Sequence, residues 1–467
     1  MQCSNVSWRN GFLNHNKRGS FSNKLGFVLS AAGASVGLGN IWRFPYLSAK
    51  YGGGAFLLVY IILALTFGYT MIIAETAIGR ATKKSPVGAF KVYGDNLPMR
   101  IGGWLNAIVP MLIVPYYAVI GGWVTKYLFE YIRSDVNSIA TDTFFTEFIT
   151  NGAAAEFWFI VFAAMVVGVI FLGVRNGIEL VSRIMMPILV VLAVIISIYS
   201  ITRPGAVAGI KYFLIPNFSN FSLMTVVSAM GQMFYSLSIA MGILITFGSY
   251  LKKDVSIETS TEQVEFFDTA IAIFASLMII PAVFAFSGGD PAMLNAGPSL
   301  MFITMPKIFA SMGFGKLIGI LFFVLVLFAA LTSGIALMES AVSTFTDEFK
   351  WNRKFATTVM AVIMLALGSL SSLGYGPLAN VTIAGMQFLD FFDFLTNSIM
   401  MPIAALATCI YVVRFMTIAR VEEEIMIDDH PFRRRKVFAF MIRFLCPLFV
   451  TIILLSSIAS VLGWIKM

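Results

Sequence analysis

Eleven long apolar stretches constrain this chain more than any other feature of its sequence. Each is close to the roughly 20 apolar residues that a helix needs to cross a bilayer. Only 12% of the 467 residues are charged, against about 25% in a soluble domain. The sequence therefore predicts an all-α polytopic membrane protein, with spans at about residues 25–48, 53–78, 103–130, 156–173, 179–201, 222–250, 266–287, 316–345, 355–373, 383–413 and 437–463.

The distribution of Lys and Arg predicts which ends of the spans face the cytoplasm. With the N-terminus inside, about 23 of the 32 basic residues fall in cytoplasmic segments, as the positive-inside rule requires. The segment 131–155 then lies outside and carries Asp135, Asp142 and Glu147 against one Arg133. We expect a multi-pass protein of the plasma (inner) membrane with a cytoplasmic N-terminus and an external C-terminus. The first 20 residues are polar, so no cleavable signal peptide is expected.

The chain has a net charge of +8. Because most of its basic residues fall in the cytoplasmic segments between membrane spans, this charge does not indicate a nucleic-acid partner. The densest charge run is VEEEIMIDDHPFRRRK, residues 421–436. Its basic end, Arg433 to Lys436, is expected at the anionic inner leaflet. The expected partners are the lipid bilayer and a small substrate, bound by a monomer or a weak homodimer.

Two spans contain residues that interrupt a helix. VGLGN (36–40) lies in the first span and SLSIAMG (236–242) in the sixth. In lipid, unwound backbone persists only where it lines a cavity or binds a ligand. Packing between helices is the alternative explanation for any single glycine.

The two breaks are five spans apart, so ten spans divide into two sets of five, and the second set is inverted because five is odd. Such a pair is typical of a transporter whose site lies between the repeats. The predicted organisation is a cytoplasmic segment 1–24, a first repeat 25–201, an outer loop 202–221, a second repeat 222–413, a cytoplasmic loop 414–436, and span 11 with the C-terminus, 437–467.

The stretch GASVG (33–37) also matches the G-x-S-x-G motif of serine hydrolases. A serine nucleophile needs a general base beside it. The two histidines, His15 and His430, lie in polar cytoplasmic segments. The sequence also has no G-x-x-x-x-G-K-[ST] motif for an ATP-driven pump. The chain is therefore not expected to be an enzyme, and no catalytic residue is assigned.

Five motifs carry a resemblance to a known family. They are GASVGLGNIWRFPY (33–46), KYGGGAF (50–56), PYY (115–117), GQMFYSLSIAMG (231–242) and LFAALTSGIALM (327–338). They resemble the neurotransmitter:sodium symporter family, in its prokaryotic, LeuT-like branch of eleven-span amino-acid transporters. The resemblance implies the LeuT-type fold, a 5+5 inverted repeat with broken helices 1 and 6 plus an eleventh span. It also implies sodium-coupled symport of an amino acid by alternating access.

The resemblance implies a substrate site between the two broken helices. The substrate carboxylate would meet the amides of Leu38 and Gly39 and the hydroxyl of Tyr117, because an anion gains from free N–H groups at a helix end. The ammonium group would meet backbone carbonyls of both breaks. The implied substrate-binding residues are Ser35, Leu38, Gly39, Ile113, Tyr117, Tyr235, Ser236, Ser238, Met241, Ser333 and Leu337.

Two sodium sites are also implied, with hard oxygen ligands that suit a hard cation. The first comprises Ser35, Asn40, Ser236 and Asp268, together with the substrate carboxylate. The second comprises Gly33, Val36, Ala329, Thr332 and Ser333. Animal relatives need chloride and have an asparagine near Asp268. The carboxylate in FDTAIA (267–272) can supply that negative charge, so chloride is not expected. A structural pair with another donor is the alternative role for this acid.

The family closes its site with two gates. On the outer side Arg43 would pair with an acid of span 10, for which Asp390 is preferred over Asp393. On the inner side Arg18 would pair with Asp347, near a position where Phe21 replaces the family's usual tryptophan. The implied gating residues are Arg43, Asp390, Asp393, Arg18, Phe21, Tyr250 and Asp347.

The pocket residues predict the class of substrate. Met241 is flexible and adapts to varied shapes, which favours a bulky hydrophobic or aromatic amino acid. Relatives that carry amines place an aspartate where this chain has Gly37, so space remains here for a substrate carboxylate. The alternatives are a small aliphatic amino acid, or a sodium-independent permease or non-transporting sensor of the same fold. Asn40 and the hydroxyls of Thr332 and Ser333 argue against sodium independence.

Overall fold

The described part of the chain is built from helices. The computed structural model describes residues 19–288 and 298–461. Arg18, the predicted inner-gate arginine, lies outside these ranges. Within them, strand-like pairing is limited to two isolated bridges, Gly53 with Pro216 and Ile383 with Met386. The all-α prediction is confirmed.

The first half of the chain forms five spans with short connecting helices. Several spans contain short π-helical segments. The label η is used for these segments and for 3₁₀ turns alike. The bounds of the elements in this half are α1 (Lys24–Ser35), η1 (Gly39–Arg43), α2 (Phe44–Lys50), α3 (Gly54–Leu63), η2 (Ala64–Gly68), α4 (Tyr69–Thr82), α5 (Pro86–Tyr93), α6 (Leu97–Arg133), α7 (Val136–Ile139), α8 (Phe144–Thr150), α9 (Gly152–Phe171), η3 (Val174–Glu179) and α10 (Leu180–Ile201).

The second half begins with two connecting elements. Its bounds are α11 (Ala206–Leu214), η4 (Phe218–Asn220), α12 (Leu223–Ser236), α13 (Ile243–Tyr250), α14 (Ile257–Ser287), η6 (Leu300–Thr304), α15 (Met305–Ser311), α16 (Gly315–Glu348), α17 (Arg353–Leu373), α18 (Phe388–Asp393), η7 (Phe394–Met400), α19 (Met401–Ile410), η8 (Tyr411–Met416), α20 (Ile418–Ile425), η9 (Ile427–Asp429), α21 (Arg435–Phe440), η10 (Met441–Leu445) and α22 (Cys446–Val461).

Nine continuous helices in the described residues are long and apolar enough to cross a membrane. A tenth candidate is the pair Lys24–Ser35 and Gly39–Lys50, which bends by 55° at its break. The predicted span 222–250 corresponds to α12, of 14 residues, and α13, of 8 residues. Neither piece spans alone, because residues 237–242 between them are not helical.

The predicted start of the seventh span, residue 266, is wrong. Helix α14 already begins at Ile257, with the Ser256 hydroxyl accepting a hydrogen bond from the Thr259 amide at 3.4 Å. Its first turns carry Glu258, Glu262 and Glu265, which lower the local hydropathy and conceal the helix from a search for apolar residues.

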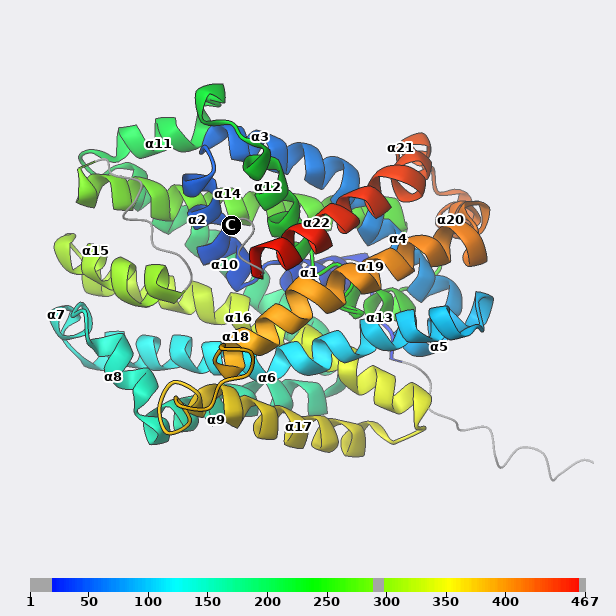
Figure 1. The fold of residues 1–467 in the computed structure, drawn as a ribbon, viewed down its shortest axis with the longest axis horizontal. Coiled ribbons are helices and arrows are strands. Elements are labelled where there is room, and N and C mark those ends of the chain that lie inside the picture. The colour runs from blue at the N-terminus through cyan, green and yellow to red at the C-terminus, as the bar shows by residue number, and fades with distance from the viewer. Residues whose placement is uncertain (1–18, 289–297, 462–467) are drawn as a thin grey trace, which may run out of the picture.

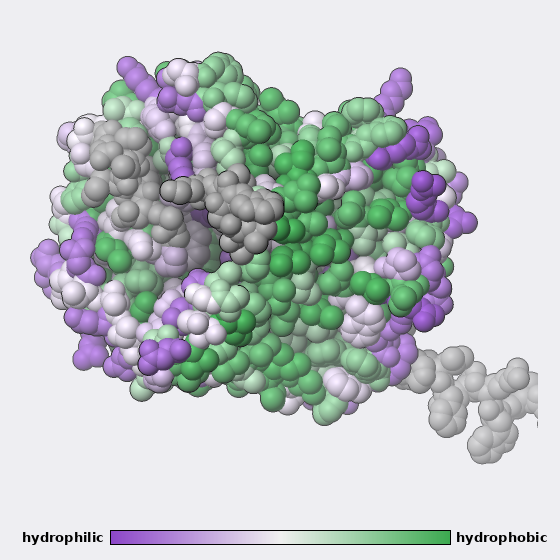
Figure 2. Space-filling model, in the orientation of Figure 1, coloured by the Kyte–Doolittle hydropathy of each residue, from purple (hydrophilic) through white to green (hydrophobic). Residues whose placement is uncertain are grey.

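The long helices run side by side, with α7, α8, α11 and α15 at one end and α5, α20 and α21 at the other (Figure 1). In the space-filling view a broad apolar band separates two polar rims (Figure 2). Lipid-facing residues such as Ile62, Val191 and Ile198 are about half exposed. The first broken helix, by contrast, is enclosed, because α1 packs against α14, α16 and α10.

Candidate functional site

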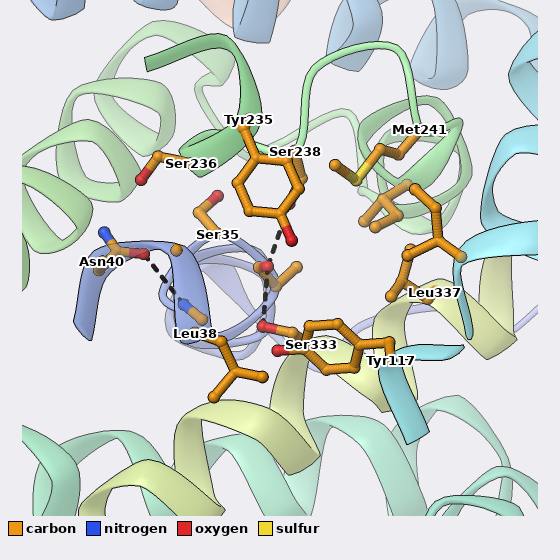
Figure 3. A pocket seen from close by; sticks show the side chains of 15 residues that line it. Ser35, Leu38, Asn40, Tyr117, Tyr235, Ser236, Ser238, Met241, Ser333 and Leu337 are labelled. Carbon is orange, nitrogen blue, oxygen red and sulfur yellow. Dashed lines mark hydrogen bonds between the residues drawn. The ribbon is translucent and has the colours of Figure 1, made fainter. Parts of the chain in front are cut away.

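A cavity of about 30 Å³ lies in the middle of the bundle, between the two broken helices, α6 and α16. In Figure 3, Ser35, Asn40 and Ser236 lie at one end, and Met241 and Leu337 at the other. All eleven residues implied for substrate binding line the cavity. Three further lining residues, Ala34, Gly37 and Ile243, were not among the implied substrate-binding residues, although Gly37 was expected to leave space for the substrate carboxylate. All three lie in or next to the breaks, so a list of every residue flanking a break would have included them.

The first break is shaped by the side chain of Asn40. Helix α1 ends at Ser35, and Val36 is extended, with φ −71° and ψ 98°. The Asn40 Oδ1 atom accepts a hydrogen bond from the Gly37 amide at 3.1 Å (Figure 3). This bond replaces a lost helical partner in a region where water is absent. Leu38 and Tyr117 both line the cavity, and the buried Tyr117 hydroxyl has no hydrogen-bond partner among the described residues.

Gly37 is required by close packing. A Cβ atom at this position would lie 2.8 Å from Ser333 Oγ and 3.3 Å from the Tyr117 hydroxyl. Any side chain here would therefore clash with α16 and occupy the polar end of the cavity. Gly37 keeps this space open.

The second break has an unusual backbone and its own polar support. Ser238 and Ala240 adopt positive φ angles of 54° and 61°, which cost non-glycine residues about 1 kcal/mol or more each. The Ala240 amide donates a hydrogen bond to Oε1 of Glu75 at 2.8 Å. Glu75 lies on α4 and is fully buried. Sequence reasoning missed Glu75. A lone acid in an apolar span was the available signal.

The Ala34 carbonyl joins the breaks to α16. It accepts hydrogen bonds from Ser238 Oγ at 3.1 Å and from Ser333 Oγ at 3.2 Å (Figure 3). The end of α1, the second break and α16 therefore meet at one oxygen atom. A shift of any of these elements must break at least one of these bonds.

Of the residues implied for the first sodium site, Asn40 and Ser236 contact Asp268, whereas the Ser35 hydroxyl donates to the Ala31 carbonyl within α1. The Asp268 carboxylate accepts from Asn40 Nδ2 at 2.8 Å, from Ser236 Oγ at 2.9 and 3.1 Å, and from the Tyr60 hydroxyl at 3.0 Å. Asp268 is fully buried. Sequence reasoning missed Tyr60. Asn40 turns its Nδ2 atom toward Asp268, so the hard oxygen ligands gathered here are those of Asp268, Ser236 and Tyr60.

The residues implied for the second sodium site also lie together. Ser333 Oγ is 3.2 Å from the Gly33 carbonyl oxygen and 3.3 Å from that of Val36. On the same helix, Thr332 Oγ1 donates to the Ala329 carbonyl at 3.2 Å. Carbonyl oxygens from a helix end thus converge on one hydroxyl. Such neutral oxygens suit a cation of low charge density.

On the outer side of the cavity, Arg43 lies over the ring of Tyr235, 5.2 Å from its centroid. Asp393 Oδ1 accepts hydrogen bonds from Asn397 Nδ2 at 2.5 Å and from the Tyr116 hydroxyl at 3.3 Å. The charge of Arg43 acts on Asp393. Asp390 instead lies 3.5 Å from the Tyr375 hydroxyl. The preference for Asp390 as the partner of Arg43 stays a prediction.

On the inner side Phe21 is buried and packs edge-on against Phe27, Phe247 and Tyr250. The replacement of the usual tryptophan therefore leaves an aromatic cluster in place. Asp347 accepts a hydrogen bond from the Ser85 amide at 2.6 Å.

A polar network that sequence reasoning missed lies beneath this cluster. The Tyr250 hydroxyl donates to Glu339 at 2.7 Å, and Arg353 pairs with Glu339 at 2.6 Å. It ties α13, α16 and α17 together. Glu339 is buried on α16, whereas Arg353 is the first residue of α17, after the loop that joins the two helices. No sequence motif therefore indicated that these two residues pair.

Comparison with known proteins gives consistent matches over almost the whole chain. The model of the sodium:neurotransmitter symporter family matches residues 18–148 and 146–464. The sodium-dependent transporter YhdH of Bacillus subtilis is 31% identical over 96% of this chain and 99% of its own length. A sodium-dependent transporter of Haemophilus influenzae is 32% identical over 95% and 99%, respectively.

A solved structure is also similar. MhsT, crystallised in complex with L-phenylalanine, is 36% identical and superimposes with a TM-score of 0.85, over 94% of this chain and 100% of MhsT.

Proposed function

Because the chain belongs to the sodium:neurotransmitter symporter family, we propose that it is a secondary active symporter that couples the import of one amino acid to sodium. Sodium-dependent transport is the activity of its relatives, and the chain is a transporter rather than an enzyme. It has the LeuT-type fold of MhsT, with broken helices 1 and 6. The observation that carries the proposal is the cavity at the meeting point of the two breaks, beside both clusters of oxygen ligands.

The substrate's own carboxylate is the group that couples it to sodium. It would bind the amides of Leu38 and Gly39 and the hydroxyl of Tyr117, where a helix end favours an anion. In that position it also completes the oxygen set formed by Asn40 and Ser236 next to Asp268. Sodium and the amino acid then stabilise each other by direct attraction. Chloride is not needed, because Asp268 provides a fixed negative charge.

Alternating access follows from the contacts that the breaks make. The inner side is closed by the Phe21 cluster, and Arg18, which lies outside the described residues, is expected to pair there with Asp347. The outer side is closed by Tyr117 and Tyr235 under Arg43 and an acid of α18. The cytoplasmic end is the one that carries α5, α20 and α21, where basic residues collect. The N-terminus lies on that side and the C-terminus outside, in the plasma (inner) membrane.

The side-chain end of the cavity selects the substrate. Ile113, Met241 and Leu337 line this end, and Met241 can change its rotamers at little cost. A bulky hydrophobic or aromatic amino acid fits this lining, and MhsT holds L-phenylalanine in its crystal structure. A small aliphatic amino acid is the second candidate, because a cavity of 30 Å³ has room for about two water molecules as it stands.

We expect one class of amino acid to stabilise the purified protein only when sodium is present. A ligand at 100 times its Kd stabilises the folded state by about 2.7 kcal/mol. A thermal-shift screen in sodium and in potassium buffer, followed by proteoliposome uptake with and without a sodium gradient, measures this coupling. Phenylalanine, leucine and alanine separate the two candidate classes. Equal stabilisation in potassium would overturn the proposed coupling.

Ser333→Ala is expected to raise the sodium concentration needed for half-maximal substrate binding about tenfold, because one ligand to the second sodium ion is removed. Binding at saturating sodium should return toward that of the parent protein. Ser343→Ala is the matched control, since this buried hydroxyl of the same helix donates to the Ser340 carbonyl at 3.0 Å, away from the cavity. An unchanged sodium dependence for Ser333→Ala would remove this residue from the ion site.

A further inference from the structure

A second cavity, of about 250 Å³, lies on the side of the bundle, between η2, the first half of α14 and the residue before α21. It shares no lining residue with the central cavity. Leu65 and Phe266 line it and are 46% and 69% exposed. Apolar side chains with that exposure on membrane-spanning helices face lipid. The cavity therefore opens sideways into the bilayer.

The interior of this cavity is acidic. Glu265 is only 4% exposed, and its Oε2 atom has no hydrogen-bond partner in the described part of the chain. Glu262 and Arg434 also line the cavity, 3.6 Å apart. Because Glu262 and Arg434 pair with each other, Glu265 Oε2 is an acceptor in this cavity that no described residue satisfies.

Arg434 is already engaged in several directions. Its guanidinium lies 4.7 Å from the centroid of the Tyr69 ring, and Nη1 lies 3.5 Å from the Leu65 carbonyl oxygen. It therefore lies at the end of the cavity toward α21, while Glu265 lines the same cavity from α14. A cation at Glu265 and an anion at Arg434 would match this separation of charge.

Leaving a carboxylate unpaired in a membrane protein is costly. A metal ion is a poor partner here, because it would find only two carboxylates and the Thr269 hydroxyl among the lining side chains. A primary ammonium group needs fewer ligands and supplies three N–H donors. The exposed Leu65 and Phe266 at the rim require that the same molecule has an apolar part.

We propose that this lateral cavity binds the head group of an aminophospholipid of the phosphatidylethanolamine class. Its ammonium group donates to Glu265 and Glu262, its phosphate faces Arg434, and its acyl chains lie along Leu65 and Phe266. The lipid comes from the leaflet beside α21, the cytoplasmic one in the orientation proposed above. Because it contacts both η2 and α14, a bound lipid should stabilise the packing of these two spans.

The test uses the full-length protein purified into phosphatidylcholine nanodiscs, to which phosphatidylethanolamine or phosphatidylglycerol is added. Bound lipid is counted by native mass spectrometry, and stability is measured by thermal unfolding. Glu265→Gln should lower retained phosphatidylethanolamine about tenfold and abolish the stabilisation that this lipid gives. Phosphatidylcholine, which has the same charge but no N–H donor, should bind weakly to both proteins.

Glu156→Gln is the matched control, because Glu156 is another membrane-embedded glutamate with an orphaned Oε2 atom, on α9. It should retain phosphatidylethanolamine like the parent protein. Thr269→Leu, which narrows the cavity without changing its charge, should also reduce lipid binding, and it provides a second test if Glu265→Gln folds poorly. If the Glu265→Gln and Thr269→Leu variants both retain as much phosphatidylethanolamine as the parent protein, the proposal is overturned. Equal stabilisation by phosphatidylcholine or by free ethanolamine would also overturn it.

Discussion

Asp268→Asn is expected to lower sodium-dependent amino-acid affinity about 100-fold in chloride-free buffer. The reason is that a unit charge some 4–5 Å from a cation contributes roughly 3 kcal/mol at an effective dielectric constant of about 20. The carboxylate accepts hydrogen bonds from Asn40, Ser236 and Tyr60. An asparagine would keep the volume of this group but remove its charge. Saturation binding of radiolabelled substrate in sodium gluconate measures the change.

The role of Asp268 as a built-in anion makes a second result expected. Asp268→Ser removes the carboxylate and leaves space where it stood, so chloride should restore much of the lost affinity. Asp268→Glu keeps the charge and should not respond to chloride. Melting temperatures of the variants control for loss of folding, because the same group holds three elements together. High affinity of Asp268→Asn without chloride would show that the negative charge is not needed.

Gly37→Ala should reduce substrate affinity at least about 100-fold, because a close contact costing roughly 3 kcal/mol must be relieved at the polar end of the cavity. The added Cβ would lie 2.8 Å from Ser333 Oγ. It would also project into the space proposed for the substrate carboxylate. Equilibrium binding at saturating sodium, with detergent stability recorded in parallel, measures the effect.

Gly231→Ala is the matched control for this substitution. Gly231 lies in α12, and a Cβ there would meet nothing within 4 Å. Its affinity and stability should match those of the parent protein, because alanine also favours a helix. If Gly37→Ala binds substrate as tightly as Gly231→Ala does, the polar end of the cavity is not where the carboxylate lies.

The spans and the breaks could be predicted from the sequence because both depend on local composition. A run of some 20 apolar residues has few options other than a membrane helix. Residues 36–40 and 236–242 interrupt such runs, and the structure has breaks at both positions. The residues expected around the substrate lie at those breaks or on α6 and α16, and all of them line the central cavity.

What the sequence could not determine are the partners that lie far apart in the chain. The start of α14 was missed because its first turns carry acids. The partners of two of these acids, Tyr69 for Glu258 and Arg434 for Glu262, lie far away in the chain. Glu75 supports the Ala240 amide across 165 positions. Likewise, the position of Arg43 relative to Asp390 and Asp393 depends on how α18 packs on α6.

The sequence by itself therefore determined the membrane-spanning helices, the two places where they break and the chemical types of the groups exposed there. What supports the second break and where the side cavity opens became visible only in the packed bundle. The physical reason is that hydropathy and helix breaking are properties of neighbouring residues. Buried charges and orphaned amides, in contrast, are satisfied by whichever helix packs against them.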